Sequence, residues 1–390
     1  MKFEKLKNIV DVKKGKKPSF VETPDENSVR VLQIDDLRND SNPKFTNDKT
    51  GVLAKEDDVL IAWDGANAGT IGFGKSGYIG STIALLRKKQ PELYSTTFIG
   101  IFLQSQYQYL RSKTTGATIP HISRKALDEL EIPVISVSDQ LHIANLLSKA
   151  ENLIAQRKES IRLLVEFLKS TFLEMFGEPS TNKKKFQKGK IKDVVTEVKY
   201  GTSSPAEDEG QYPYLRMNNI TPDGYMDYSK LKYINIVDEN DKEKYSVRKG
   251  DLLFNRTNSK ELVGKTGVFN EDSEMIIAGY LIRVRTNEKA NPWYLWGYLN
   301  SIHGKQTLLG MCKSIVGMAN INAQELQGIK ILIPPIELQT QFAQIVEKTE
   351  ALKTQYQQSL TELENLYGSL SQKAFKGELT IKRNETIEAQ

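Results

Sequence analysis

The sequence predicts a mixed α+β (α/β) protein: two similar globular domains separated by two long helices that form an antiparallel coiled coil, in a pseudo-twofold internal repeat. Three observations predict this fold. Matching segments occur in the same order in both halves of the chain. Short β-prone runs alternate with turns rich in Gly, Asn and Asp. Segments 139–176 and 338–376 contain no Pro and almost no Gly, which is typical of uninterrupted helices.

The internal repeat covers nearly the whole chain. The matched pairs are Lys5–Gly15 with Lys190–Gly201, Val29–Leu37 with Tyr212–Ile220, Glu56–Gly65 with Lys249–Asn258, Ala68–Gly74 with Val263–Phe269, His121–Pro133 with Asn320–Pro334, and Gln140–Leu153 with Gln339–Leu352. Such a repeat predicts that each half folds into the same unit.

The repeat also sets the domain boundaries. We predict a first globular domain at 1–138, a central long helix at 139–178, a second globular domain at 179–335, a distal long helix at 336–380 and a polar tail at 381–390. Within the globular domains, Thr96–Lys113 and Pro292–Leu309 have helical character.

Composition excludes several classes of protein. The chain has 390 residues, of which 39% are hydrophobic and 26% charged, and its net charge is +5. No apolar run approaches the roughly 18 residues of a membrane span, and the N-terminus has no signal-peptide core. One Cys and three scattered His residues are too few for a disulfide or a zinc site. A cytoplasmic protein is expected, and its mildly basic charge permits a nucleic-acid partner.

Residues 69–76, GTIGFGKS, match the phosphate-binding pattern G-x-x-x-x-G-K-[ST]. A phosphate loop needs a helix after its Ser, whereas Gly77, Tyr78, Ile79 and Gly80 favour a strand. The second half has Phe269–Glu271 in place of the Gly-Lys-Ser. We therefore expect a glycine turn shared by both halves, and a nucleotide-binding enzyme using residues 69–76 remains the alternative.

The long helices carry apolar stripes at heptad spacing. The second helix has a seam of a and d positions, and the repeat places Leu153 and Phe167 at the matched seam of the first helix. The first helix has a neighbouring stripe that includes Leu147, Ile154, Ile161, Leu168 and Met175. The candidates for helix–helix packing or partner docking are Ile143, Leu147, Ile154, Ile161, Leu168, Phe342, Ile345, Leu352, Tyr356, Leu363 and Leu366.

The paired segments IPVISVSDQLHIANLLSKAENLI and IPPIELQTQFAQIVEKTEALK, with the GDLLFNRT…GKTGVF core, resemble the specificity (S) subunit of Type I restriction-modification systems. The Pro-Pro-x-x-x-Gln start of the second long helix is a hallmark of that family, and the first half departs from it with a single Pro133. The resemblance covers residues 1 to about 380. It implies two target recognition domains, each reading one half of a bipartite sequence in double-stranded DNA.

The resemblance also implies the partners. The long helices would hold the spacing and dock two modification (methyltransferase) subunits, and restriction (endonuclease/translocase) subunits would join them. S-adenosylmethionine, ATP and magnesium would be bound by those partners, with no cofactor or metal on this chain.

The residues themselves favour a non-catalytic adaptor. No methyltransferase loop or Ser-His-Asp set is recognisable. The acid pairs Asp35-Asp36 and Asp57-Asp58 are ones that a nuclease could use, but Asp57-Asp58 precedes a strand and is better explained as a turn than as a metal site. A coiled-coil scaffold without DNA specificity is a further alternative.

Candidate DNA contacts come from basic and amide side chains in the matched loops. They are Lys14, Lys16, Lys17, Trp63, Asn67, Lys75, Arg111 and Lys113 in the first half, and Lys199, Tyr200, Ser203, Arg216, Asn218, Arg256, Asn258, Lys260, Lys265 and Lys313 in the second.

Overall fold

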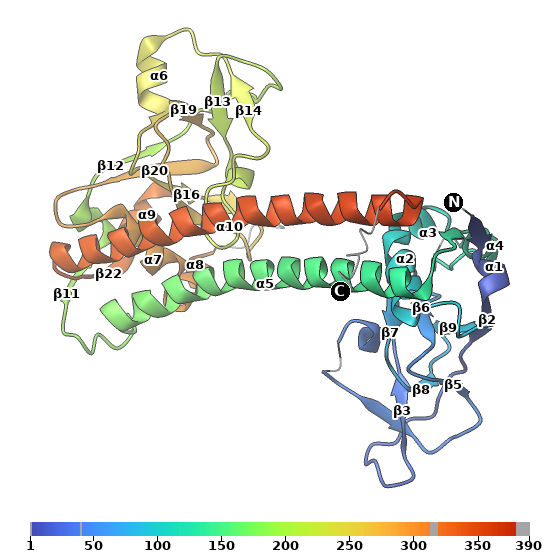
Figure 1. The fold of residues 1–390 in the computed structure, drawn as a ribbon. Helices are drawn as coiled ribbons and strands as arrows, with labels where there is room; N and C mark the ends of the chain where they lie inside the picture. The colour runs from blue at the N-terminus through green and yellow to red at the C-terminus, as the bar shows by residue number, and fades with distance from the viewer. Residues whose placement is uncertain (1, 40, 117, 313–318, 380–390) are drawn as a thin grey trace, which may run out of the picture. The chain divides into compact units, whose positions relative to one another are not determined.

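The computed structural model describes residues 2–39, 41–116, 118–312 and 319–379, and the chain divides into two compact units. Unit 1 comprises Met1–Lys158 and Gln358–Gln390, and unit 2 comprises Glu159–Gln357. Each unit therefore holds one globular part and part of both long helices, drawn as ribbons in Figure 1. The predicted polar tail at 381–390 lies outside the described residues.

The globular part of unit 1 combines small sheets with short helices. The first sheet has the antiparallel order β2 (Val10–Lys14), β9 (Ile83–Lys88), β6 (Val59–Ala62), β7 (Ile71–Phe73). The second has the order β4 (Lys44–Thr46), β3 (Val29–Leu32), β8 (Gly77–Ile79), β5 (Val52–Ala54), with β3 and β8 parallel. Strand β1 (Phe3–Lys5) pairs with β10 (Glu131–Pro133). The helices are α1 (Leu6–Ile9), α2 (Thr96–Ser105), α3 (Tyr107–Ser112) and α4 (Arg124–Asp128), with a 3-10 turn at Asp35–Leu37.

The globular part of unit 2 repeats this arrangement. Its first sheet is β12 (Val195–Tyr200), β20 (Leu281–Thr286), β16 (Leu252–Asn255), β18 (Thr266–Val268), and its second is β14 (Lys232–Ile234), β13 (Tyr212–Leu215), β19 (Met275–Ile277), β15 (Ser246–Val247). The paired strands are β11 (Gln187–Lys190) with β22 (Lys330–Ile333) and β17 (Thr257–Asn258) with β21 (Ala319–Asn320). The helices are α6 (Glu239–Tyr245), α7 (Pro292–Asn300), α8 (Ile302–Met311) and α9 (Ala323–Gly328), with 3-10 turns at Ile191–Val194 and Met217–Asn219.

The internal repeat predicted from the sequence is confirmed by strand order and register. In unit 1, Ile61 of β6 pairs with Ala84 of β9, and in unit 2 Phe254 of β16 pairs with Ile282 of β20. Both second sheets contain one parallel pair at the same place. The mixed α+β prediction with two repeated domains is therefore confirmed.

A repeated ion pair accounts for one of the acid pairs in the sequence. Asp58 accepts hydrogen bonds from the Lys55 backbone N–H at 2.9 Å and from Arg87 Nε at 2.8 Å. Asp251 accepts in the same way from the Arg248 N–H at 2.8 Å and from Arg285 Nε at 2.8 Å. Both carboxylates are buried, and each closes the turn before a central strand, as expected for a structural role.

The glycine motif at 69–76 contains strand β7 and the turn that leads into strand β8, which begins at Gly77. Gly69 and its counterpart Gly264 have φ angles of +96° and +76°, in the left-handed region that favours glycine. Residues 77–79 after the Lys-Ser are strand β8, so no helix N-terminus is present to bind a phosphate. This geometry confirms the glycine turn and removes the structural basis for the phosphate-loop alternative.

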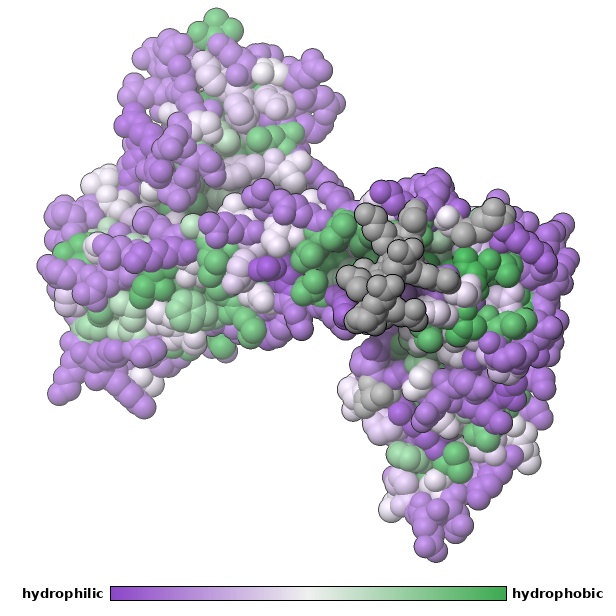
Figure 2. Space-filling model, viewed as in Figure 1, coloured by the Kyte–Doolittle hydropathy of each residue, from purple (hydrophilic) through white to green (hydrophobic). Residues whose placement is uncertain are grey.

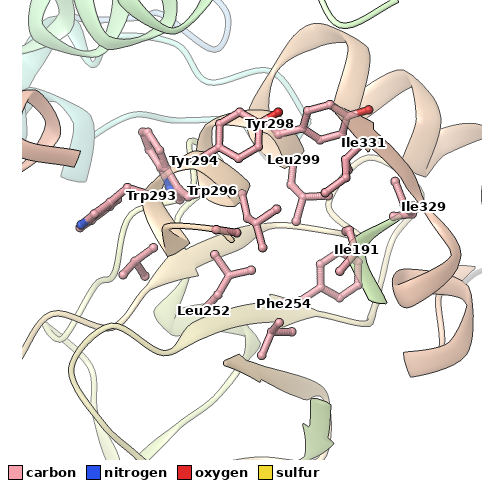
Figure 3. Packing of buried hydrophobic residues seen from close by; sticks show 14 of the residues in the cluster. Ile191, Leu252, Phe254, Trp293, Tyr294, Trp296, Tyr298, Leu299, Ile329 and Ile331 are labelled. Carbon is pink, nitrogen blue, oxygen red and sulfur yellow. The ribbon is translucent and has the colours of Figure 1, made fainter. Parts of the chain in front are cut away.

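Apolar strand residues pack inward against helices, while hydrophilic residues cover most of the face shown in Figure 2. In unit 2 the sheet residues Leu252 and Phe254 lie beneath helix α7 and share a core cluster with its Trp296 and Leu299 (Figure 3). The residues Leu253 and Leu281 belong to a separate cluster with the second sheet. The central sheet of unit 2 thus has both faces covered, which holds its loops in place.

The long helices are α5 (Val137–Phe176) and α10 (Ile336–Lys376). In unit 1 the start of α5, at Ile143 and Leu147, shares a core cluster with Ala374 near the end of α10. In unit 2 the end of α5, at Phe172, packs on Phe342 near the start of α10, with ring centroids 5.5 Å apart. The beginning of each helix therefore meets the end of the other, so the two helices run antiparallel.

A buried glutamine anchors each long helix to its globular part. Gln140 accepts from the Ser95 N–H at 2.8 Å and donates to the carbonyls of Leu93 and Ile135 at 2.8 and 3.0 Å. Gln339 accepts from the Asn291 N–H at 2.9 Å and donates to the carbonyls of Lys289 and Pro334 at 3.0 and 2.8 Å. Both side chains are fully buried, and in each the amide oxygen accepts one hydrogen bond while the amide nitrogen donates two.

The predicted helical stretches within the globular parts are each split in two. The first breaks at Gln106, which leaves helical geometry with φ −89° and ψ 4°. The second breaks at Ser301, where the backbone is extended. The Ser301 side chain caps α8 by accepting a hydrogen bond from the Gly304 N–H at 3.0 Å. A serine side chain that caps a new helix favours ending the preceding one, which explains the break at Ser301.

Candidate nucleic-acid interface

In each unit, the loops matched by the internal repeat lie at the same end of that unit's own central sheet. Trp63 follows β6, and its N–H donates to Thr82 O at 2.7 Å while its carbonyl accepts from the Ile122 N–H at 2.9 Å. Arg256 follows β16 and makes the same two backbone bonds, to Tyr280 O at 3.0 Å and from the Ile321 N–H at 2.9 Å. Positions 63 and 256 are therefore structurally equivalent. We call the surroundings of these two positions the strand-end sites.

The strand-end site of unit 1 contains a cluster of three charged or titratable side chains. Asp64 Oδ2 lies 2.6 Å from Lys14 Nζ, and Asp64 Oδ1 lies 2.6 Å from His121 Nδ1. Burial alone would raise the pKa of Asp64, but hydrogen bonds from Lys14 and His121 outweigh it and hold the pKa below its usual range. Because the ionised carboxylate can only accept, His121 Nδ1 carries a proton. Lys14 and His121 remain about half exposed.

The strand-end site of unit 2 contains an arginine stacked on a tyrosine. The Arg256 guanidinium carbon lies 4.7 Å from the centroid of the Tyr200 ring. The Tyr200 hydroxyl accepts from the Ala323 N–H at 2.8 Å, which fixes the ring against the start of α9. The β-sheet register places Tyr200, opposite Ile282, where unit 1 has Lys14, opposite Ala84. The two units thus present different chemistry at equivalent positions.

Neighbouring loops add polar groups around both strand-end sites. Arg38 Nη2 donates to Asn67 Oδ1 at 2.7 Å and to Thr70 Oγ1 at 3.3 Å. In unit 2, Asn258 Nδ2 lies 3.8 Å from Met217 Sδ, so the loop that carries Arg216 and Asn218 lies beside the one that carries Asn258. Arg216 Nη2 donates to Lys230 O at 3.3 Å, and Asn218 is exposed.

Other candidate residues lie at the surface with weaker ties to these loops. Lys199 pairs with Glu197 at 2.8 Å. Arg111, half-buried, precedes Thr115, which exchanges two backbone hydrogen bonds with His121. The exposed candidates are Lys16, Lys17, Lys113, Ser203 and Lys260. Lys313 lies outside the described residues.

Two candidates are placed away from the interface. Lys265 is only 6% exposed, and its ammonium donates to the backbone carbonyls of Met217, at 2.8 Å, and Ile220. Burial lowers its pKa. It is a structural lysine that satisfies two buried carbonyls, so the predicted DNA contact does not fit its position. Lys75 follows the end of β7, which pairs with the start of β6, so it lies at the opposite end of the sheet from Trp63.

Sequence reasoning missed three residues of the strand-end sites and one neighbour. These are Asp64, His121, Asn320 and Arg38. Asp64 and His121 are matched by Thr257 and Asn320, which pair as β17 and β21. The signal was present in the repeat itself, because His121 and Asn320 begin matched segments with polar side chains of different chemistry.

Some of the candidate residues on the long helices are buried in the cores of the units, and the others are partly or largely exposed. Ile143, Leu147, Leu168 and Phe342 are 3% exposed or less and belong to the cores of their units, which assigns them to packing. The half-buried candidates are Ile154, Ile161, Ile345, Leu352, Tyr356 and Leu363, and Leu366 is 51% exposed.

The seam predicted for the first long helix is partly wrong. Leu153 and Phe167 were placed on it by the repeat but are 51% and 47% exposed. The packed face of α5 combines predicted seam residues, such as Ile143 and Ala150, with Leu147 and Leu168 of the neighbouring stripe. Near the end of the helix, Leu168 and Phe172, four residues apart, belong to the core of unit 2. Apolar patches remain visible where α5 runs along unit 2 (Figure 2).

Within the described residues, no group of three or more His, Cys, Asp or Glu side chains is arranged to hold a metal ion. The second acid pair of the sequence is also structural: Asp36 accepts from the Gln33 N–H at 2.7 Å and pairs with Arg30 at 2.9 Å. No helix within the same residues combines the length and apolarity that a membrane span requires.

Comparison with known proteins matches residues 1–163 and 183–365 to the model of the Type I restriction modification DNA specificity domain. The chain belongs to this family. It is 24% identical over 352 residues to the EcoKI specificity subunit of Escherichia coli K12, covering 83% of this chain and 75% of that protein. It is 25% identical over 362 residues to the MjaVIII specificity subunit of Methanocaldococcus jannaschii, covering 87% and 83%.

The fold agrees with that of the family. The structure of a Type I restriction-modification S subunit from M. genitalium matches with a TM-score of 0.59 at 17% identity, covering 96% of each chain. The family and fold implied by the sequence are therefore confirmed.

Proposed function

We propose that this chain recognises a bipartite sequence in double-stranded DNA and directs Type I modification and restriction subunits to it. Each unit reads one half of the target through the loops around its strand-end site. The chain itself is a non-catalytic specificity subunit that works in the cytoplasm.

The observation that carries this proposal is the contrast between the two strand-end sites. The fold, strand register and backbone hydrogen bonds around positions 63 and 256 are the same. The side chains at these sites differ: Lys14, Asp64 and His121 in one unit, Tyr200 and Arg256 in the other. A duplicated scaffold with different donor and acceptor groups suits a protein that reads two different sequences, because bases are distinguished by their hydrogen-bonding edges.

The proposal assigns the chemistry to partner subunits. Two modification subunits supply methyl transfer with S-adenosylmethionine, and restriction subunits supply ATP- and magnesium-dependent steps. The exposed apolar residues of α5, such as Phe167 and Leu173, suit a protein partner because an exposed apolar stripe is costly to leave in water. No cofactor is assigned to this chain.

Selection of bound duplexes from a random pool tests the proposal. The chain, alone or with its modification subunits, is expected to enrich two short blocks separated by a gap of fixed length. Binding without any enriched sequence would instead support a scaffold without DNA specificity. ATP binding by the pure chain that is lost in Lys75→Ala would support the nucleotide-binding alternative.

A further inference from the structure

We propose that Arg256 is a specificity-determining residue that reads a guanine in the half-site bound by unit 2, with Tyr200 as its positioning residue. This inference rests on the proposed DNA-recognition function and names one of the contacts that would carry it.

The backbone of Arg256 is fixed on both sides. Its N–H donates to Tyr280 O at 3.0 Å, and its carbonyl accepts from the Ile321 N–H at 2.9 Å. The residue directly follows β16, a strand whose side chains are buried. Arg256 therefore leaves a rigid strand at a defined point, which suits a contact that must be placed within a fraction of an ångström.

The guanidinium is also fixed in orientation. It stacks 4.7 Å from the centroid of the Tyr200 ring, and that ring is held through its hydroxyl by the Ala323 N–H at 2.8 Å. A stacked guanidinium keeps its donors at the edge of the plane, free to bond in that plane. Two parallel N–H groups in this arrangement match the O6 and N7 acceptors of guanine in the major groove.

The fold gives Arg256 a stacking partner but, among the described residues, no acid partner. The other arginines of this sheet are paired: Arg283 with Glu197, and Arg285 with Asp251 at 2.8 Å. Within the described residues, no carboxylate pairs with the Arg256 guanidinium. Its Nε is buried, so an external acceptor would bond the terminal Nη groups. An oriented arginine that the protein leaves without an acid partner has capacity for an external acceptor.

Unit 1 shows that the scaffold does not require an arginine here. The equivalent position holds Trp63, and the lysine of that strand-end site, Lys14, is bonded to Asp64 at 2.6 Å. The same backbone geometry is thus built without a free guanidinium. The role of Arg256 is specific to the half-site of unit 2, and the half-site of unit 1 should not depend on it.

The test compares pools of bound duplexes selected by the parent chain, Arg256→Ala and Arg256→Gln, each with its modification subunits. The parent is expected to enrich guanine at one position of one half-site. Both variants should lose that preference, and Arg256→Ala should bind the best parental site about 10- to 100-fold more weakly, as expected for one bidentate base contact. The other positions and the other half-site should be unchanged.

Matched variants separate base reading from charge. Lys330→Ala removes one positive charge from an exposed position of the same unit and should leave the base preferences as they are. Tyr200→Phe keeps the ring but loses the hydroxyl that bonds the Ala323 N–H, so it should weaken the guanine preference less than Tyr200→Leu, which loses the stack as well.

The outcomes distinguish this inference from the function on which it rests. If the parent selects a bipartite site and the Arg256 variants keep every base preference, the assignment of Arg256 is wrong and the DNA-recognition function stands. If the parent enriches no sequence, both fail. Arg256→Gln keeps a polar side chain of similar width, and equal helix content by circular dichroism for both variants and the parent shows that the fold is intact.

Discussion

Gln339 shows how one residue can tie a long helix to a globular part. Its fully buried amide bonds three backbone groups, on Lys289, Asn291 and Pro334. Gln339→Leu leaves those groups buried without partners and should lower the free energy of unfolding of unit 2 by about 2–4 kcal/mol. Urea unfolding followed by the fluorescence of Trp293 and Trp296 measures this loss.

The matched control is Gln341→Leu, two residues along the same helix at an exposed position. Its effect on the unfolding midpoint should be small. Equal losses from the two substitutions would mean that the buried amide contributes nothing beyond helix propensity.

Glu197 makes the stability of unit 2 depend on pH. Burial favours its neutral form, but hydrogen bonds from Lys199 and Arg283 lower its pKa to about 2. The folded-state pKa is below the unfolded value of about 4.3, so the stabilisation is present above that pH and is lost as pH falls toward 2. Glu197→Gln should therefore be less stable than the parent at pH 7, and the difference should shrink between about pH 4.5 and pH 2.

Urea midpoints of both proteins across this range measure the effect, with the exposed Glu288→Gln as the control. A difference between Glu197→Gln and the parent that stays constant from pH 7 to pH 2 would contradict the assigned ionisation.

At the residue scale, the sequence predicted the loops better than the contacts. Lys14, Tyr200 and Arg256 were found because they lie in matched loops next to β strands. Lys265 was misassigned because a lysine in a glycine-rich loop looks exposed, and only the fold shows that it bonds two buried carbonyls. Asp64 and His121 were missed because their contact joins residues far apart in the chain.

At the scale of elements, the long helices were predicted closely. Lack of Pro and Gly and a regular apolar pattern are local properties, and the helices observed are Val137–Phe176 and Ile336–Lys376. Which stripe of α5 packs inward was not local information, because it depends on the aromatic cluster of Phe172, Phe176 and Phe342. The break at Ser301 likewise depends on a side-chain cap that competes with helix continuation, whereas Gln106 makes no side-chain cap.

The helices are proposed to set the distance between the half-sites, and their length can be changed. Four alanine-rich residues inserted after Lys158 and four after Gln357 would lengthen both helices by about 6 Å, with a rotation of about 40°. DNA rises about 3.4 Å per base pair, so the preferred gap should grow by one or two base pairs while both half-sites stay the same. Selection from a random pool measures the gap, and circular dichroism checks the gain in helix.

The control places the same four residues after Val237, which is 99% exposed and outside both helices. That variant should keep the parental gap. An unchanged gap in the variant with two longer helices would show that the helices do not determine the spacing.

At the scale of the whole molecule, the repeated fold predicts that the units read DNA independently. The two globular parts have the same strand order but separate hydrophobic cores. Residues from both long helices pack in each core, and in each unit a different buried glutamine bonds a long helix to the globular part. The repeat was readable from the sequence because its segments keep their order, whereas the identity of the target bases depends on side-chain placement around each strand end.

Exchange of the second globular part tests this independence most directly. Residues 179–335 are replaced by the matched region of a relative with a different target, and bound duplexes are selected from a random pool with the parent, the relative and the hybrid. The hybrid should keep one parental half-site and the parental gap and take its other half-site from the relative. A hybrid that folds and binds but changes both half-sites together, or changes neither, would contradict reading by two independent units.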